Sequence, residues 1–322
     1  MRKFVFFGGK GGVGKTTVSS AYGLKCARAG VSTLVVSTDP AHSVSDVFDQ
    51  DFGDEPSSVA DESHLDAMEI DPEREVERHF METKRALSDQ VSAGIVNEID
   101  RQIEMAHQTP GAYEAALFDR FVDVMRESDE YDRVVFDTSP TGSTLRLLSL
   151  PSFLEGWIDR LHHKRERSIR LFERAAIGNN EPRRLLDDDP ILARLQARKE
   201  TFEFAGEVLH KQAAFFLVLN PDELSIRETE RAIGSLEEYG LAVEGLVVNR
   251  LTPEPDDDET GRGARYLRDR CATERSRLKH IREDLAPPVC ATIETRVEEI
   301  KGEFVEEVAA ELDIEVAVAQ RV

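Results

Sequence analysis

Short apolar runs alternate with longer stretches of helical periodicity along most of the chain. Five of these runs (FVFF, TLVVST, RVVFD, FFLVL and GLVVN) are almost uninterrupted and rich in β-branched or aromatic residues. Such runs are typical of strands that are buried on both faces of a parallel sheet. We expect strands at Lys3–Gly8, Thr33–Thr38, Leu65–Ile70, Arg133–Asp137, Ala214–Leu219, Gly245–Asn249 and Val289–Ile293. With helices between them, the pattern predicts an α/β fold with a doubly wound, mostly parallel sheet.

Two long helical stretches interrupt this alternation. The first carries a line of apolar residues at helical spacing, made up of Phe80, Leu87, Val91, Ile95, Ile99, Ile103 and Ala106. The second, from Pro151 to Lys211, is divided by the turn signals GNNEP and DDDP. We interpret residues 1–322 as a single domain in which 72–130 and 151–212 form an inserted α-helical subdomain. Its apolar lines are interpreted as ordinary core, with a binding groove as the alternative.

Composition and the pattern of apolar residues indicate in which compartment the protein is found. The chain has 322 residues and is 40% hydrophobic, which is enough for a large core. No apolar run approaches the roughly 18–20 residues that a membrane span requires. The N-terminus reaches its glycines too early for a signal peptide, so we expect a cytoplasmic protein. The cysteines, Cys26, Cys271 and Cys290, match no zinc or redox spacing, and Cys26 is expected to be buried in the first helix.

The charge of the chain excludes one class of partner. The formal net charge is −22, whereas nonspecific binding to nucleic acid requires a basic surface. Of the 41 basic residues only 10 are lysines. Many acids and few lysines indicate adaptation to concentrated salt, as in a salt-adapted archaeon, because salt screens the self-repulsion of the charges. An ordinary acidic surface is the alternative.

The motif that carries chemistry by itself is GKGGVGKT, from Gly9 to Thr16. It satisfies G-x-x-x-x-G-K-[ST], follows the first strand and opens a helix expected from Thr17 to about Ala29. In such a loop the backbone N–H groups surround phosphates at a helix N-terminus. Lys15 is expected to bridge the β- and γ-phosphates, and the Thr16 hydroxyl to hold Mg²⁺. The candidate nucleotide-binding residues are Gly9, Lys10, Gly11, Gly12, Val13, Gly14, Lys15, Thr16 and Thr17.

Lys10 is a second lysine in a loop whose grip on phosphate needs only one. It sits at the start of the loop, where we expect its side chain to point away from the phosphates of its own chain. The run GKGGVGKTT resembles the deviant phosphate loop of the ParA, MinD, nitrogenase-iron-protein and ArsA group. The resemblance implies that Lys10 reaches the partner's nucleotide across a dimer interface and stabilises charge on the transferred phosphoryl group. The alternative is a solvated lysine.

Two further segments narrow the resemblance to the ArsA-like ATPases. The sequence STDPAHSVSD, beginning at Ser37, is similar to the family's switch I, which implies that Asp39 orients the attacking water near Mg²⁺. A helix cap is the alternative for this carboxylate. The sequence DTSPTGSTLRLL, beginning at Asp137, resembles switch II, with Asp137 holding the water shell of Mg²⁺. Ser139 and Ser143 depart from the family's usual alanine and histidine.

A third segment, Val247 to Arg250, resembles the strand end with which the family reads adenine. The Asn249 amide offers both a donor and an acceptor, which suits the edge of that base, although a strand-ending asparagine also makes turns. The stretch Val289–Glu294 is expected to close over the base. It departs from the family's usual proline-leucine pattern.

The resemblance covers nearly the whole chain and implies a homodimeric ATPase that uses ATP and Mg²⁺. Lys10, Lys15 and Asp39 would be its catalytic residues, and Thr16, Asp39 and Asp137 its metal site. The family includes the factor that targets tail-anchored membrane proteins, so the favoured partner is a hydrophobic membrane-protein client. The alternative is the membrane subunit of an arsenite or anion pump, and a switch for some other partner stays open.

Several departures from the family bear on this choice. The targeting factors carry a C-x-x-C pair that shares zinc across the dimer, but the matching region here has only Cys271, so we expect no structural zinc. Five methionines and the charged run LHHKRERSIRLFERAA argue against a methionine-rich client groove. Arsenite-pump ATPases have two fused halves and a cysteine trio, neither of which this sequence shows. A ParA-like protein on DNA or membrane is disfavoured by the acidic C-terminal segment.

Overall fold

The computed structural model describes residues 2–38, 43–71, 74–78, 81, 112–137, 159–160, 163–164, 167 and 190–316. Its centre is an eight-stranded sheet in the order β3-β4-β2-β5-β1-β6-β7-β8. The strands are β1 (Phe4–Gly9), β2 (Thr33–Ser37), β3 (Ser57–Ser58), β4 (Leu65–Glu69), β5 (Arg133–Asp137), β6 (Ala213–Leu219), β7 (Val243–Leu251) and β8 (Val289–Glu294). All neighbours pair in parallel except β3 and β4.

The α/β fold with a mostly parallel sheet is therefore confirmed. Each strand expected from the sequence is present, with ends that lie within two residues of the expected ones. The pattern missed β3, because a strand of two exposed serines has no apolar alternation to reveal it.

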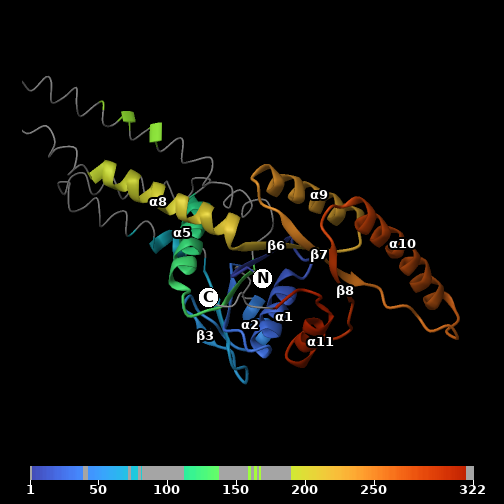
Figure 1. Cartoon of the computed structure of the whole chain (residues 1–322). Helices are drawn as coiled ribbons and strands as arrows, with labels where there is room; N and C mark the ends of the chain where they lie inside the picture. The colour runs from blue at the N-terminus through green and yellow to red at the C-terminus, as the bar shows by residue number, and fades with distance from the viewer. Residues whose placement is uncertain are drawn as a thin grey trace, which may run out of the picture.

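Helices cover both faces of the sheet (Figure 1). They are α1 (Lys15–Arg28), α2 (Ser43–Phe48), α5 (Ala112–Glu127), α8 (Pro190–Lys211), α9 (Glu223–Glu238), α10 (Arg262–Asp284) and α11 (Glu303–Glu311). Alternate residues of β1 enter different cores. Val5 and Phe7 pack with α1, α2 and α11, whereas Phe4 and Phe6 pack with α5 and α8. Helices α9 and α10 cover β6 and β7 on the same face as α5 and α8.

The predicted inserted helical subdomain, residues 72–130 and 151–212, lies largely outside the described residues, and the apolar line expected from Phe80 to Ala106 lies entirely outside them. Its division from the sheet domain stays a prediction. The described ends of both segments belong to the core of the sheet, since Phe118 and Phe121 of α5 and Phe202 and Leu209 of α8 are buried in one cluster with the strands. Helical periodicity shows that a helix has an apolar face, but not which surface covers it.

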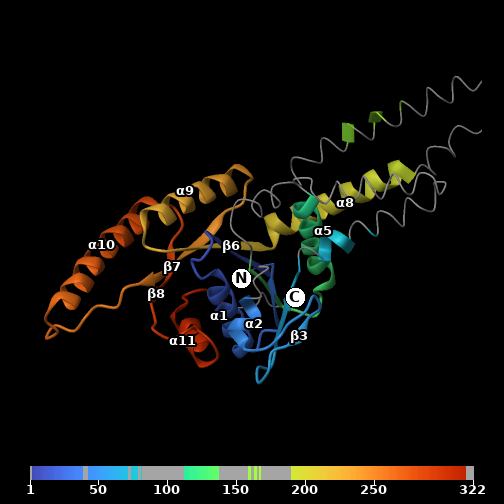
Figure 2. The same cartoon turned by 180° about the vertical axis from the view of Figure 1, so that it is seen from behind.

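Residues 312–316, a C-terminal segment, are hydrogen-bonded to α1, the helix that follows the phosphate loop, and to β5. The buried Tyr22 hydroxyl donates to the Glu315 carbonyl at 3.0 Å, and the Lys25 ammonium group donates to the Leu312 carbonyl. The buried Arg133 guanidinium donates from Nη2 to the Val316 carbonyl at 3.2 Å. Helix α11, which precedes this segment, lies beside α1 from both viewpoints (Figures 1 and 2). The C-terminal segment thus supports the helix whose start forms the phosphate loop.

We expect Tyr22→Phe to lower the free energy of unfolding by about 1 kcal/mol, because it keeps the ring but removes the hydroxyl, which donates to the Glu315 carbonyl and also contacts the Cys26 thiol. Urea denaturation measures the loss. Tyr239→Phe is the matched control, since Tyr239 is 39% exposed and should tolerate the change. Equal stability of the two variants would show that the tail contact contributes nothing.

Candidate functional site: a phosphate loop at the carboxyl edge of the sheet

The carboxyl ends of β1, β2 and β5 meet at one edge of the sheet. In the parallel register Ser37 of β2 lies opposite Asp137 of β5, and Phe7 of β1 lies opposite the same aspartate. The phosphate loop follows β1 directly and leads into α1. Residues far apart in sequence are therefore gathered where open α/β sheets bind their ligands.

Two glycines of the loop are required by its backbone. Gly14 has φ 92°, and a Cβ there would collide with the Asn249 amide. Gly9 has φ 146°, and a Cβ there would collide with the Val218 carbonyl of β6. Other residues rarely adopt such angles, and these close approaches leave no room for a side chain. The loop conformation predicted from the glycine pattern is therefore enforced by β6 and by the end of β7.

Lys15, Thr16 and Asp137 come together as a metal- and phosphate-binding group requires. The Thr16 hydroxyl donates to Asp137 Oδ2 at 2.6 Å, and the Ser37 hydroxyl donates to the same oxygen at 3.3 Å. Lys15 is only 7% exposed, and its ammonium group donates to the Lys10 carbonyl at 3.2 Å. A hydroxyl and a carboxylate in contact supply the hard oxygen ligands that Mg²⁺ prefers, so these residues fit the predicted ion.

Lys10 faces a different partner from Lys15. Its ammonium nitrogen lies 3.9 Å from Glu228 Oε1 of α9, and both side chains are 33% exposed. Such an exposed pair contributes little to stability and exchanges easily with solvent. The two lysines of the loop are therefore used differently: Lys15 lies over its own loop, while Lys10 is directed toward the surface of α9.

Asn249 of β7 braces the phosphate loop. Its Nδ2 donates to the Val13 carbonyl at 2.8 Å, and its Oδ1 accepts from the Arg250 amide at 2.8 Å. The residue is 5% exposed. The adenine contact predicted for Asn249 stays a prediction. It is compatible with the brace, because each polar atom of the amide has capacity for one further hydrogen bond. The brace was not foreseen from the sequence, since it joins positions that only the fold brings together.

Asp39 and the switch II residues that follow Asp137 lie outside the described residues. The structure does describe two functional candidates that sequence reasoning missed. Ser37, at the end of β2, donates to Asp137, and Glu69, at the end of β4, accepts hydrogen bonds from Val44 and Ser45 in the later part of switch I. Glu69 left one signal in the sequence, an acid between the apolar residues Met68 and Ile70 at the end of a strand.

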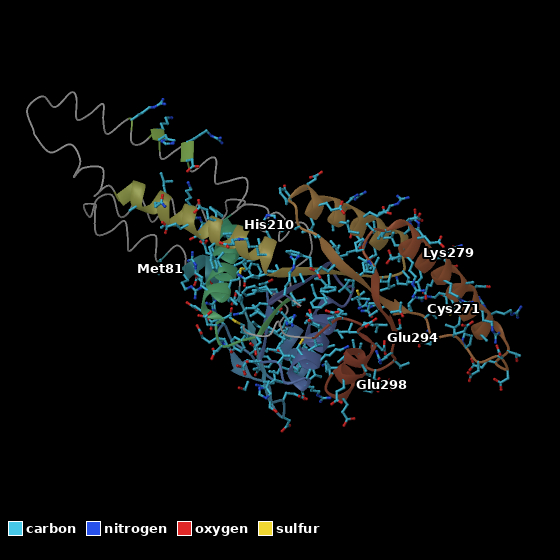
Figure 3. All side chains as sticks on the ribbon, in the orientation of Figure 1. Met81, His210, Cys271, Lys279, Glu294 and Glu298 are labelled. Carbon is cyan, nitrogen blue, oxygen red and sulfur yellow. The ribbon has the colours of Figure 1, made fainter. Side chains whose placement is uncertain are left out.

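The cysteines lie in separate surroundings. Cys26 is buried in α1, as expected from its position in the first helix. Cys271 lies on α10 (Figure 3), and its Sγ lies 3.4 Å from the Thr252 carbonyl. The Cys290 Sγ lies 3.7 Å from the Pro288 carbonyl at the start of β8. Burial raises the pKa of both thiols. Within the part of the chain that the structure describes, no three His, Cys, Asp or Glu residues gather as a metal site.

No helix among the described residues combines the length and the apolar character needed to traverse a bilayer.

The family model described as anion-transporting ATPase matches residues 2–313. A putative arsenical pump-driving ATPase 2 from Aquifex aeolicus is 32% identical over 94% of this chain and 95% of its own length. A putative arsenical pump-driving ATPase from Halobacterium salinarum is 37% identical over 78% of this chain, which corresponds to 35% of that protein. The ATPase get3 of Schizosaccharomyces japonicus is 32% identical over 79% of this chain and 76% of its own length.

The match to the family model runs from residue 2 to residue 313 and so includes the phosphate loop. A model match over nearly the whole chain, and a relative of 32% identity with near-complete mutual coverage, establish descent from one family. The chain is therefore a member of the anion-transporting ATPase family, and it is an ATPase.

Proposed function

We propose that this protein is a cytoplasmic, homodimeric ATP-driven switch that targets or chaperones hydrophobic, tail-anchored membrane proteins. The observation that carries the ATPase core of this proposal is the contact between Thr16 and Asp137 beneath a loop that Asn249 braces. The relatives named get3 and GET3A support the targeting branch, with 76% and 69% of their lengths covered. The acidic composition supports work in concentrated salt.

An ATPase subunit of an arsenite or anion pump is the second candidate. The printed name of the Aquifex relative favours it. The surroundings of the thiols favour the targeting branch, because Cys271 and Cys290 are held by carbonyls of different segments, Thr252 and Pro288. A trivalent metalloid would need thiolates converging on one point.

The proposed reaction is hydrolysis of ATP between two closed subunits. The backbone amides of residues 9–16 hold the phosphates, and Lys15 turns from the Lys10 carbonyl toward the β- and γ-phosphates. Asp39 orients water for in-line attack, and Thr16 and Asp137 hold Mg²⁺. When bound, this ion neutralises charge on the phosphate oxygens. Lys10 leaves Glu228 and stabilises the charge on the partner's transferred phosphoryl group. Release of phosphate relaxes the switches, and the helical subdomain changes its grip on the client.

The function is tested by presenting both partners to the purified protein. Targeting predicts stable, ATP-dependent capture of a tail-anchor peptide, and no capture of the same peptide with charged residues placed in its apolar segment. Arsenite should leave the ATPase rate unchanged. A rate that rises with arsenite, without capture of the peptide, would instead assign the protein to the pump branch.

Lys10→Ala should reduce turnover of ATP by about 10³-fold or more, as loss of a cation supplied in trans does. Affinity for nucleotide should change little, because Lys15 and the loop amides remain. Turnover and equilibrium binding of a fluorescent ATP analogue measure the two effects. Glu228→Gln is the control, since it removes only the partner of Lys10 within the chain. Full turnover by Lys10→Ala would exclude the role in trans.

Asn249→Ala separates a brace from a base-reading residue. Loss of a brace for the loop weakens the binding of ATP and GTP alike, because both nucleotides use the same phosphate site. Loss of a residue that reads adenine weakens the binding of ATP selectively, by a factor of about 10 for one lost hydrogen bond. We expect both effects, so affinity for ATP should fall further than affinity for GTP. Equal losses would remove Asn249 from base recognition.

A further inference from the structure

Glu69 is a buried carboxylate at the carboxyl end of β4. It is 4% exposed and ends the strand LDAME, in which Leu65, Ala67 and Met68 are also buried. A buried charge is costly unless hydrogen bonds compensate it, so the partners of this group identify what it is for.

Both carboxylate oxygens of Glu69 hold the start of α2. Oε1 accepts from the Val44 amide at 2.8 Å and from the Ser45 amide at 2.9 Å. Oε2 accepts from the Ser45 hydroxyl at 2.9 Å, and that hydroxyl oxygen also accepts from the Phe52 amide at 3.1 Å. The Glu69 amide donates to the Gly53 carbonyl at 2.7 Å. One side chain therefore fixes the later part of switch I, at Val44 and Ser45.

The backbone at the beginning of switch I is held by neighbouring strand ends. The amide of Ile70, the residue after Glu69, donates to the Ser37 carbonyl at 2.9 Å. The Thr38 amide donates to the Asp137 carbonyl at 3.3 Å. The two anchored points flank positions 39–42 in the sequence, and the consecutive residues Glu69 and Ile70 hold one point each. The anchor at Ser37 is backbone pairing, whereas the anchor at Val44 and Ser45 depends on the Glu69 side chain.

We propose that Glu69 is a positioning residue for hydrolysis: through Val44 and Ser45 it sets the place of the segment that carries Asp39. The inference rests on the proposed role of Asp39. The carboxylate is well suited to this task, because its two oxygens accept hydrogen bonds from two backbone amides and one hydroxyl at the start of a single helix. Aspartate, one methylene shorter, could not reach these groups with β4 in place.

Glu69→Ala should lower kcat by about 10- to 100-fold, the range that follows when a reacting group is misplaced by about 1 Å. Affinity for the ATP analogue should stay within about threefold, because the phosphate loop is untouched. Hydrogen exchange at the Val44 and Ser45 amides should accelerate. Glu69→Gln should recover most of kcat, since its Oε1 accepts from both amides and its Nε2 donates to the Ser45 oxygen.

Asp66→Ala is the matched control on the same strand. The Asp66 carboxylate accepts from the Tyr131 hydroxyl at 2.7 Å and from the Ser58 hydroxyl at 2.9 Å, at the opposite end of β4. Its loss should lower stability and leave kcat near the wild-type value. If Glu69→Ala fails to fold, Ser45→Ala removes the Oε2 contact alone and should lower kcat about threefold at unchanged nucleotide affinity.

Equal kcat values for Glu69→Ala and Asp66→Ala would overturn the inference, and so would unchanged exchange at Val44 and Ser45. Asp39→Asn distinguishes the two levels of the argument. Slow hydrolysis by Asp39→Asn together with full-rate Glu69→Ala refutes only the role of Glu69. Full-rate hydrolysis by Asp39→Asn refutes the proposed role of Asp39 and the inference built on it.

Discussion

The hydrogen bond from Thr16 to Asp137 joins two parts of the chain that are remote in sequence, and the rest of the site is arranged around it. It connects the first turn of α1 to the end of β5, which pairs directly with β1. The register of these parallel strands decides whether hydroxyl and carboxylate meet. A shift of one residue would turn Asp137 to the other face of the sheet. The contact between Thr16 and Asp137, the pair proposed to bind Mg²⁺, therefore depends on the pairing of the strands as well as on the two motifs.

Around this pair the edge of the sheet holds an unusual number of buried polar groups. Lys15, Glu69, Asp137 and Asn249 are each at most 7% exposed. Leaving such groups without hydrogen bonds would cost a large part of the stability of a domain, so their partners define one arrangement of the loops. Asn249 holds the phosphate loop, Glu69 holds the start of α2, and Ser37 shares the oxygen that Thr16 contacts. The buried polar groups that hold the loops in place are therefore the same groups, or direct neighbours of the groups, that we propose to take part in the reaction.

The helices on the two faces of the sheet stabilise the elements that carry the site, although they lie away from it. Helix α1 carries the phosphate-binding end, and its other surface is covered by α11 and by Leu312–Val316. On the opposite face, the buried ends of α5 and α8 connect the sheet to the segments expected to form the helical subdomain. A change at the switches can reach those segments through β5 and its packed helices, because close-packed layers transmit small displacements.

Taken alone, the sequence determined the strands, the phosphate loop and the family, because these depend on local rules: continuous β-branched runs, glycines where φ is positive, and a lysine and a hydroxyl at fixed spacing. It also placed Asp137 at a strand end, where ligands bind. Only the tertiary structure decided the roles of Glu69 and Asn249, because each acts on backbone from another part of the chain. It likewise decided that α5 and α8 cover the sheet. The periodicity of a sequence indicates that a helix face is apolar or that a charged residue stands among apolar ones. Strand order and register determine which part of the chain that face or charge contacts, and no local pattern contains this information.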